Sequence, residues 1–376
     1  MKILSLQPYY GGSHKHVMDS LLAESQHSWQ LLTLPARKWQ WRMRHAAATF
    51  AEQLASSELP KAVRQSEAIF CSDMLNLAEF RGLAPTWAAR LPAVVYFHEN
   101  QFAYPARKKY QQKQNAEYGF TNMFAACAAD QVWFNSAHNR DSFFAGLEKY
   151  LKKQSDCQPW DSFEKVQSKC RIVYPGIYPP PVPNPGERKP GPLRIAWAAR
   201  WEYDKGPEDF FDALRGLRAA GVEFRLRVLG EQFARIPDVF KQAAETFEGE
   251  IEAWGFEPSR EKYFEWLQGA DVFVSTAKHE FFGISVLEGA AAGAVPILPD
   301  RLSYPEIFAG CDNCFYDGTV LGLANKLEEV SQQLTRKDSR NWRELRRKCI
   351  DRALSFHWHK QAAEFDCGLQ EVLASP

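Results

Sequence analysis

"DVFVSTAKHEFFGISVLEGAAAGAVPILPD", residues 271–300, is the stretch that decides the fold class of this chain. An apolar run rich in β-branched residues (271–276) ends in a short polar loop. A helical segment follows and closes at Gly293, and a second apolar run covers 294–298. Strand, loop, helix and strand at this spacing form one βαβ unit. Its two strands are parallel, which predicts an α/β fold with doubly wound sheets.

Two carboxylates lie in this unit, Glu280 in the loop and Glu288 eight positions later. We expect the helix to begin near Phe282, so the two side chains are too far apart for an i,i+4 pair and face different parts of one ligand. The free N–H groups of a helix N-terminus suit phosphate, and Gly283 permits close approach. These residues predict an anionic, sugar-bearing ligand; the alternative is a solvated Glu280 and a helix-surface Glu288.

Length and composition bound the remaining possibilities. A chain of 376 residues is long enough for two domains, and 45% apolar with 24% charged residues is typical of a soluble globular protein. The formal net charge is zero, so any polyanion would have to bind a local patch. We expect no signal peptide at the N-terminus, no membrane span, reduced cysteines and a cytoplasmic location. Cys311 and Cys314 form an isolated CxxC pair without the partners of a zinc site, so we predict no metal.

The segment RKWQWRMRH, residues 37–45, is basic and aromatic and contains no acid. Cations for phosphate and rings for stacking are typical of a nucleic-acid contact, although a basic surface loop or helix start has the same composition. More basic residues return after the polar segment HENQFAYP at 98–105, which follows the predicted strand 93–97. The candidate RNA-contacting cations and rings are Arg37, Lys38, Trp39, Trp41, Arg42, Arg44, Arg107, Lys108 and Lys109.

A proline- and glycine-rich segment divides the chain. We place the first domain at residues 1–175, a linker at 176–192, the second domain at 193–354 and a last helix at 355–376. The second domain opens with a strand that ends at Arg200, and Lys205 lies in a turn before the next helix. Both cations can converge on one diphosphate, or they are surface salt-bridge partners. A later strand ends at Gly230, which we expect in the wall of a nucleotide site.

The residues EFFGISVLE resemble the glutamate, seven residues, glutamate motif of retaining GT-B glycosyltransferases of family 4. The resemblance implies two Rossmann-like domains facing a central cleft, with the last helix crossing back to the first domain. It implies that Glu280 lies beside the donor sugar, that Glu288 holds the ribose, and that Arg200 and Lys205 neutralise the leaving diphosphate without a metal. Ala199 departs from the glycine that often precedes this arginine. Other residues implied at the donor are His98, Gly11, Gly12, Phe282, Gly283 and Ile284.

The segments QPYYGGSHK, RKWQWRMRH and HENQFAYP resemble a narrower group, the tRNA-queuosine α-mannosyltransferases of the glycosyltransferase-like domain-containing protein 1 type. This resemblance implies a retaining mannosyltransferase with GDP-mannose as donor and the queuosine of a tRNA anticodon as acceptor. The acceptor would meet the basic and aromatic stretches, with His14 and Asn100 nearby. No cofactor, metal or membrane is implied, and the oligomeric state stays open.

Three alternatives remain open at this point. The same chemistry could act on a lipid or polysaccharide acceptor, although no convincing amphipathic basic helix for a membrane surface is visible. A non-catalytic RNA-binding protein on a GT-B fold is a second possibility, which the intact Glu280, Glu288, Arg200 and Lys205 disfavour. A phosphorylase or an epimerase on the same fold is a third.

Overall fold

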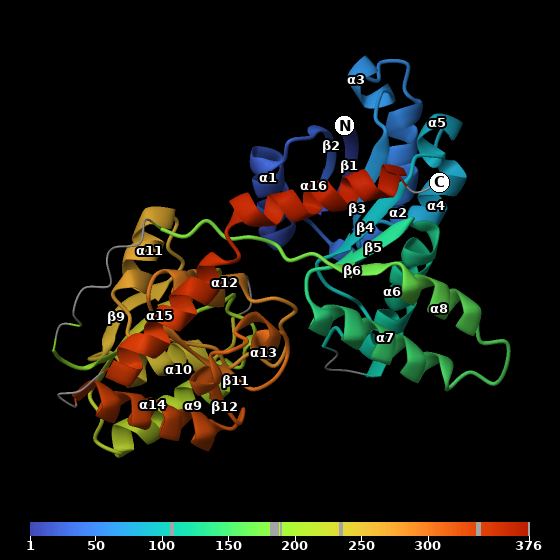
Figure 1. The fold of residues 1–376 in the computed structure, drawn as a ribbon. Helices are drawn as coiled ribbons and strands as arrows, with labels where there is room; N and C mark the ends of the chain where they lie inside the picture. Colours follow the sequence, from blue (N-terminus) through green and yellow to red (C-terminus); the bar gives the residue numbers. More distant parts are fainter. Residues whose placement is uncertain (106–108, 181–187, 189, 233–235, 336–339, 375–376) are drawn as a thin grey trace. The chain divides into compact units, whose positions relative to one another are not determined.

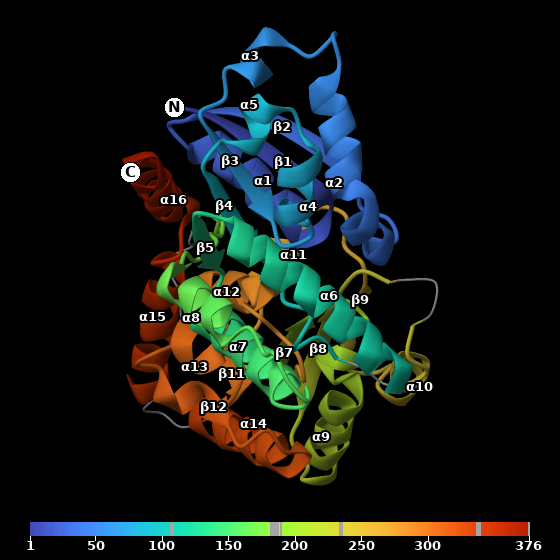
Figure 2. The same cartoon turned by 90° about the vertical axis from the view of Figure 1, so that its right-hand side faces the viewer.

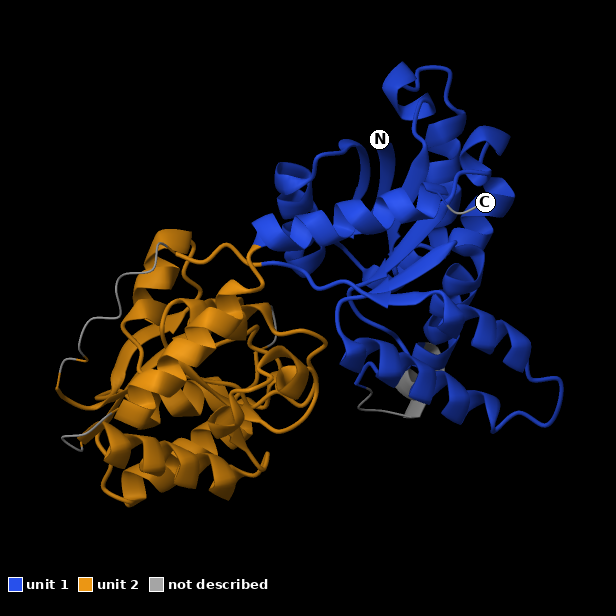
Figure 3. Cartoon of the chain, in the orientation of Figure 1, with its two compact units in different colours: residues 1–176, 358–376 blue, residues 177–357 orange. Residues whose placement is uncertain are grey.

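The structure, a computed structural model, describes residues 1–105, 109–180, 188, 190–232, 236–335 and 340–374, with backbone only for 109–114 (Figure 1). The chain forms two compact units (Figure 3): unit 1 is Met1–Gly176 with Trp358–Pro376, and unit 2 is Ile177–His357. The segment that the sequence sets apart as a linker, 176–192, therefore lies mainly in unit 2. Arg188 in this segment donates to Asp271 at 2.8 Å, which holds it to the second sheet.

The described part of unit 1 is built on one parallel sheet with the strand order β2-β1-β3-β4-β5-β6. Its strands are β1 Lys2–Tyr10, β2 Ser28–Pro35, β3 Ala68–Ser72, β4 Ala93–Phe97, β5 Gln131–Phe134 and β6 Cys170–Ile172. The helices between them are α1 Gly12–Glu24, α2 Trp39–Ala55, α3 Lys61–Arg64, α4 Leu77–Leu83, α5 Thr86–Ala89, α6 Lys109–Ala128, α7 Ala137–Leu151 and α8 Trp160–Ser168. Helices α4, α6 and α8 contact one another in succession (Figure 2).

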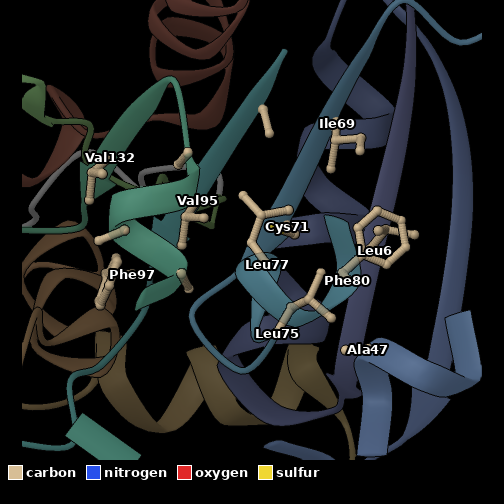
Figure 4. Close-up of a cluster of buried hydrophobic side chains, with 14 of the residues drawn as sticks. Leu6, Ala47, Ile69, Cys71, Leu75, Leu77, Phe80, Val95, Phe97 and Val132 are labelled. Carbon is tan, nitrogen blue, oxygen red and sulfur yellow. The ribbon is translucent and has the colours of Figure 1, made fainter. Parts of the chain in front are cut away.

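Alternation of side chains along the strands gives this sheet two buried faces. One face packs against α2 and α4 (Figure 4), where Leu6, Cys71 and Phe97 from three strands meet Ala47 and Phe80 from the helices. All five side chains are at most 2% exposed. Because both faces are buried, successive residues of these strands are apolar, and the strands can be recognised in the sequence as continuous apolar runs.

The other face of the sheet is covered by α1 and by α16, Trp358–Ala374, the last helix of the chain. Phe365 of α16 is fully buried, with ring centroids 5.3 Å from Tyr96 and 5.9 Å from Trp133. The Asp366 carboxylate accepts from the Ser25 hydroxyl and, at 2.8 Å, from the Gln26 N–H, just beyond the end of α1. These contacts make the C-terminal helix part of unit 1, although the chain reaches it only after completing unit 2.

Unit 2 contains a second parallel sheet, whose described strands have the order β12-β11-β10-β7-β8-β9. They are β7 Leu193–Ala198, β8 Phe224–Leu229, β9 Ile251–Gly255, β10 Val272–Val274, β11 Val295–Pro299 and β12 Phe315–Tyr316. The helices are α9 Pro207–Ala219, α10 Val239–Thr246, α11 Arg260–Gln268, α12 Ile284–Ala291, α13 Tyr304–Ile307, α14 Val320–Thr335 and α15 Arg340–Leu354, with two short 3₁₀ turns, Tyr203–Lys205 and Asp312–Cys314. The predicted α/β class with two doubly wound sheets is confirmed.

The first strand extends beyond its apolar run. It continues to Tyr10 because it pairs with β2 there, and α1 begins at Gly12 directly after it. Residues 39–45 of the basic segment form the first turns of α2, and Arg37 and Lys38 precede the helix. Ser136 is the N-cap of α7, since its hydroxyl accepts from the Asn139 N–H at 2.9 Å. In the described part of the chain, no helix has both the length and the apolar character that a membrane span requires.

The packing of α16 predicts the effect of adding one methyl group. A Cβ at Gly368 would lie 2.5 Å from the buried ring of Trp133, so Gly368→Ala should lower the free energy of unfolding by about 1–3 kcal/mol. Gly82, on the exposed face of α4, has no atom within 4 Å of such a Cβ. Gly82→Ala should therefore raise the free energy of unfolding by up to about 1 kcal/mol, because alanine has a higher helix propensity than glycine. Urea unfolding of both variants measures the difference; equal effects would contradict the docking of α16.

Candidate active site

The order of strands in unit 2 reverses between β7 and β10, which are neighbours in the sheet. From β7 the chain proceeds to β8 and β9 on one side, and from β10 to β11 and β12 on the other. The loops that leave β7 and β10 therefore diverge and open a crevice at the carboxyl ends of the strands, where open α/β sheets bind ligands. Lys205 lies in the first loop and Glu280 in the second.

Lys205 and Glu280 form an ion pair across this crevice. The Lys205 Nζ lies 3.2 Å from Glu280 Oε2 and donates to the His279 carbonyl at 2.9 Å. Burial alone lowers the pKa of Lys205, but the carboxylates of Glu280 and Asp204 outweigh it and the net pKa is raised. Burial likewise raises the pKa of Glu280, and Lys205 more than reverses this. Both groups are therefore charged at neutral pH.

The two loops are joined by more than the ion pair. The Thr276 hydroxyl donates to the Lys205 carbonyl at 2.9 Å, and the Lys278 N–H donates to the Asp204 carbonyl at 2.8 Å. Gly206 has φ of 65°, and a Cβ there would lie 2.3 Å from the Thr276 carbonyl oxygen. Glycine is required at this position both by its left-handed conformation and by the close approach of the two loops.

Arg200, the second predicted cation, is placed differently from Lys205. Its side chain is 46% exposed and lies 3.1 Å from Glu202, while it is still close enough to lower the pKa of Lys205. The structure therefore brings the two cations to the same loop, one buried and paired, the other at the surface. The pair thus offers a buried charge inside the crevice and an exposed one beside it.

The N-terminus of α12 faces the same crevice. Gly283, in the left-handed conformation with φ of 103°, precedes the first helical residue, Ile284. Phe282 is buried, and its carbonyl accepts from the Ser303 hydroxyl at 2.8 Å. The first N–H groups of any α-helix have no carbonyl partner within the helix, so this end offers donors to an anion. Phe282, Gly283 and Ile284 thus shape the helix end, as donor-binding residues would.

Glu288 is held in place by two side chains of α11. Arg260 donates to its Oε1 at 3.0 Å and the Tyr263 hydroxyl to its Oε2 at 3.1 Å. Burial raises the pKa of Glu288 although both partners oppose the shift. A carboxylate has about four acceptor positions, so these two bonds leave further acceptor positions on Glu288 unused. Arg260 and Tyr263 were not predicted from the sequence, because they lie 28 and 25 positions before the glutamate that they orient.

Two pockets lie side by side at this edge of unit 2 and share Ala198, Ala199 and Ser285. The inner pocket reaches Lys205 and Glu280. The outer pocket is lined by Gly230, Tyr263 and the loop after β9, and it contains the position expected for the nucleotide wall. The two pockets therefore meet at the first turn of α12.

In unit 1, the predicted residues His14 and His98 lie against each other with ring centroids 4.0 Å apart. Burial lowers the pKa of His14 to about 4, and burial together with His14 lowers the pKa of His98. Both imidazoles are therefore neutral at pH 7. Asp73, at the end of β3, accepts from the His98 N–H at 3.0 Å; burial and the neighbouring Glu99 raise its pKa. Among the described residues, Asp73 Oδ2 and His14 Nδ1 are buried without a hydrogen-bond partner.

Gly11, Gly12 and Asn100, three further predicted residues of unit 1, have structural roles. Gly11 caps α1, and a Cβ there would lie 2.3 Å from the Ala36 Cβ, while Gly12 has open space around it. Asn100 is fully buried: its amide donates to Asn139 and Ser142 and its carbonyl oxygen accepts from the Ala103 N–H. This side chain orders the loop after β4 instead of presenting its amide on the surface, which argues against the predicted acceptor contact.

The two tryptophans of the basic segment differ in their surroundings. The Trp39 ring packs 5.2 Å from Tyr118 in a small cluster with Met43 and Met74. Trp41 is 58% exposed and lies 4.8 Å from the His45 ring. Among the cations near Trp41 in the sequence, Arg37, Lys38 and Arg44 are exposed and Arg42 is partly buried. Arg107, Lys108 and the side chain of Lys109 lie outside the described residues.

Metal-binding geometry is not found in the part of the chain that the structure describes, where no three His, Cys, Asp or Glu side chains could together hold an ion. Cys311 and Cys314 of the CxxC pair are both buried, and the Cys314 sulfur lies 3.3 Å from that of Cys349. All eight cysteines are free thiols.

Family models match both halves of the chain. Residues 2–177 match the model described as "tRNA-queuosine alpha-mannosyltransferase N-terminal", and residues 183–353 match "Glycosyl transferases group 1". The chain is 35% identical over 316 residues to a tRNA-queuosine alpha-mannosyltransferase of Drosophila melanogaster, which covers 81% of each protein. It is 28% identical over 185 residues to a GDP-mannose:cellobiosyl-diphosphopolyprenol alpha-mannosyltransferase of Xanthomonas campestris, about half of each chain (48% and 47%).

Solved structures share the fold over the whole length. Sucrose-phosphate synthase from Thermosynechococcus elongatus has a TM-score of 0.71 at 14% identity, with 100% of both chains covered. A trehalose 6-phosphate synthase from Burkholderia multivorans has a TM-score of 0.67 at 14% identity, covering 100% of this chain and 97% of that one. The fold is GT-B, and the similarity to the fly enzyme extends over both units. The chain belongs to the family of tRNA-queuosine alpha-mannosyltransferases.

Proposed function

We propose that this protein transfers mannose from GDP-mannose to the queuosine of a tRNA anticodon, in the cytoplasm and with retention at the anomeric carbon. The observation that carries the proposal is the 35% identity to a tRNA-queuosine alpha-mannosyltransferase across 81% of the chain. The donor-side residues Lys205, Glu280 and Glu288 are all present and ordered in unit 2. An intact site of this kind favours an enzyme over a non-catalytic RNA-binding protein.

The leaving diphosphate would be stabilised electrostatically. Breaking the bond between mannose and phosphate develops negative charge on the phosphate, and fixed positive groups lower the barrier. Arg200 at the rim, Lys205 in the crevice and the N-terminus of α12 supply such groups. The proposal therefore assigns this task to the protein and does not require a metal ion or another cofactor.

Retention fits attack on the same face of the sugar from which the diphosphate leaves. In this scheme the leaving phosphate accepts the proton of the acceptor hydroxyl, and Glu280 positions or stabilises the sugar without forming a covalent bond. Glu280 is already engaged by Lys205 at 3.2 Å, and Glu288 is tied to Arg260 and Tyr263. Two carboxylates that straddle one glycosidic bond, as in glycosidases, are not part of this arrangement.

On the acceptor side, the exposed start of α2 is the surface that suits RNA. Trp41 presents an open ring, and the exposed cations Arg37, Lys38 and Arg44 lie close to it in sequence. Single-stranded loops are recognised by stacking of bases on aromatic rings together with cations for the phosphates. The formal charge of the whole chain is zero, so a local surface of this kind is needed for a polyanion.

A labelling experiment tests donor and acceptor together. The protein is incubated with radiolabelled GDP-mannose and either tRNA from cells that make queuosine or tRNA from cells that cannot make it. We expect label only in the tRNA that contains queuosine, at an equal rate in excess EDTA, and an α-linked product by NMR.

Label in neither tRNA, with turnover of another nucleotide sugar, would keep a GT-B glycosyltransferase and reject the proposed acceptor. Loss of label in EDTA, restored by a divalent cation, would reject only the metal-free mechanism. A β-linked product from the α-configured donor would reject retention.

Removing Arg200 should slow chemistry more than it weakens binding. We expect Arg200→Ala to lower kcat by about 100-fold or more, with a KM for GDP-mannose changed much less, because the charge it neutralises appears mainly in the transition state. Arg215→Ala is the matched control, since its side chain on α9 is equally exposed at 46%. A change confined to KM in Arg200→Ala would contradict its assignment to the leaving group.

The two tryptophans of α2 allow a second comparison. Trp41→Ala should raise the KM for tRNA by roughly 10-fold or more, with GDP binding unchanged, because a stacked base is worth about 1–3 kcal/mol. Phe124→Ala, which removes another exposed aromatic side chain of unit 1 (53% exposed), should leave the KM near that of the unchanged protein. Equal KM values for tRNA in both variants would remove Trp41 from the acceptor surface.

A further inference from the structure

The outer pocket of unit 2 combines an exposed aromatic ring with two carboxylates. It lies at the carboxyl ends of β7, β8 and β9, and its outer wall is formed by Phe256 and Glu257, the two residues after β9. Glu231, the second residue after β8, also lines this pocket. An aromatic ring beside a carboxylate in one pocket is a combination that can both hold a nucleobase and identify it.

Phe256 is the group that would hold the base. It is 63% exposed although it belongs to a pocket wall, so a large apolar face is open to a ligand. Stacking on such a face accepts any base, because every base has a π-face. The ring therefore gives affinity for a nucleotide but no preference among guanine, adenine and uracil.

The position of this pocket next to Glu288 fits a nucleoside. Tyr263 lines the pocket and also donates to Glu288 Oε2 at 3.1 Å. Ser285, in the first turn of α12, lines both this pocket and the inner one. Ribose at Glu288 and a diphosphate at the start of α12 would therefore leave the outer pocket for the base.

The Glu257 carboxylate is held in one orientation by a backbone hydrogen bond. Its Oε1 accepts from the Ser259 N–H at 2.9 Å, and the Ser259 hydroxyl in turn caps α11 by accepting from the Lys262 N–H at 3.2 Å. The side chain is half-buried. A carboxylate offers about four acceptor positions, so the bond from Ser259 leaves several of them for a ligand.

We propose that Glu257 selects guanine as the base of the sugar donor by accepting hydrogen bonds from its N1–H and 2-amino group. Guanine presents these two donors side by side, which matches the two oxygens of a carboxylate. Uracil offers one N–H between two carbonyl oxygens, and adenine offers a bare ring nitrogen at the same edge. A fixed negative charge repels both patterns. This assignment rests on the proposed function and adds to it the group that identifies the nucleotide.

Inosine diphosphate differs from GDP only in lacking the 2-amino group, so comparing the two nucleotides isolates the hydrogen bond from that group. Binding of GDP, inosine diphosphate and UDP is measured by calorimetry on the unchanged protein, Glu257→Gln and Glu231→Gln. We expect the unchanged protein to bind GDP at least about 10-fold more tightly than inosine diphosphate, since hydrogen bonds to charged groups have this magnitude. Glu257→Gln should bring the two affinities within about 3-fold, and Glu231→Gln should keep the difference.

The other outcomes separate two kinds of failure. If the unchanged protein prefers GDP and Glu257→Gln keeps the full preference over inosine diphosphate, the assignment to Glu257 is overturned and a guanine nucleotide donor stands. If Glu231→Gln alone abolishes the preference, the same assignment is overturned in favour of Glu231. If the unchanged protein binds UDP as tightly as GDP or more so, the donor in the proposed function fails as well. Thermal unfolding of each variant verifies that it is folded.

Discussion

The crevice of unit 2 depends on the ion pair between Lys205 and Glu280. These residues belong to loops that leave neighbouring strands in opposite directions, and a doubly wound parallel sheet opens a crevice at such a point. The ion pair, with the bonds from Thr276 and Lys278 to the first loop, fixes the separation of the crevice walls. Glycine at position 206 is required so that the two backbones can approach. A ligand entering the crevice thus meets a paired carboxylate and an ammonium group whose charges are already fixed.

Under the proposed function, the two units divide the chemistry between them. Unit 2 contains the N-terminal end of α12, the oriented Glu288 and the two adjoining pockets. Unit 1 contains a neutral, buried pair of imidazoles and an exposed ring on α2. The model specific to tRNA-queuosine enzymes matches residues 2–177, and the general glycosyltransferase model matches residues 183–353. The specific model thus matches the half of the chain that the proposed function assigns to the acceptor, and the general model matches the half that it assigns to the donor.

Much of the fold could be predicted from the sequence. Parallel strands buried on both faces appear as uninterrupted apolar runs, and their order with intervening helices determines the α/β class. The unit at 271–300 was located with its strands, its loop and its helix, because glycine and β-branched residues mark these boundaries locally. The extension of the first strand to Tyr10 is not visible in the sequence, since its last residues are polar or aromatic and only the pairing with β2 extends it.

By itself, the sequence determined the α/β class, the glutamate motif with its loop and helix, and the resemblance to the family, because each depends on residues near one another in the chain. Only the tertiary structure decided which side chains meet. It separated an exposed Trp41 from a packed Trp39, buried Asn100 among hydrogen bonds, and joined Arg260 and Tyr263 to Glu288. It also placed α16 on the first sheet, where Phe365 fills an aromatic cluster. These outcomes depend on packing between distant segments, which local patterns of polarity do not encode.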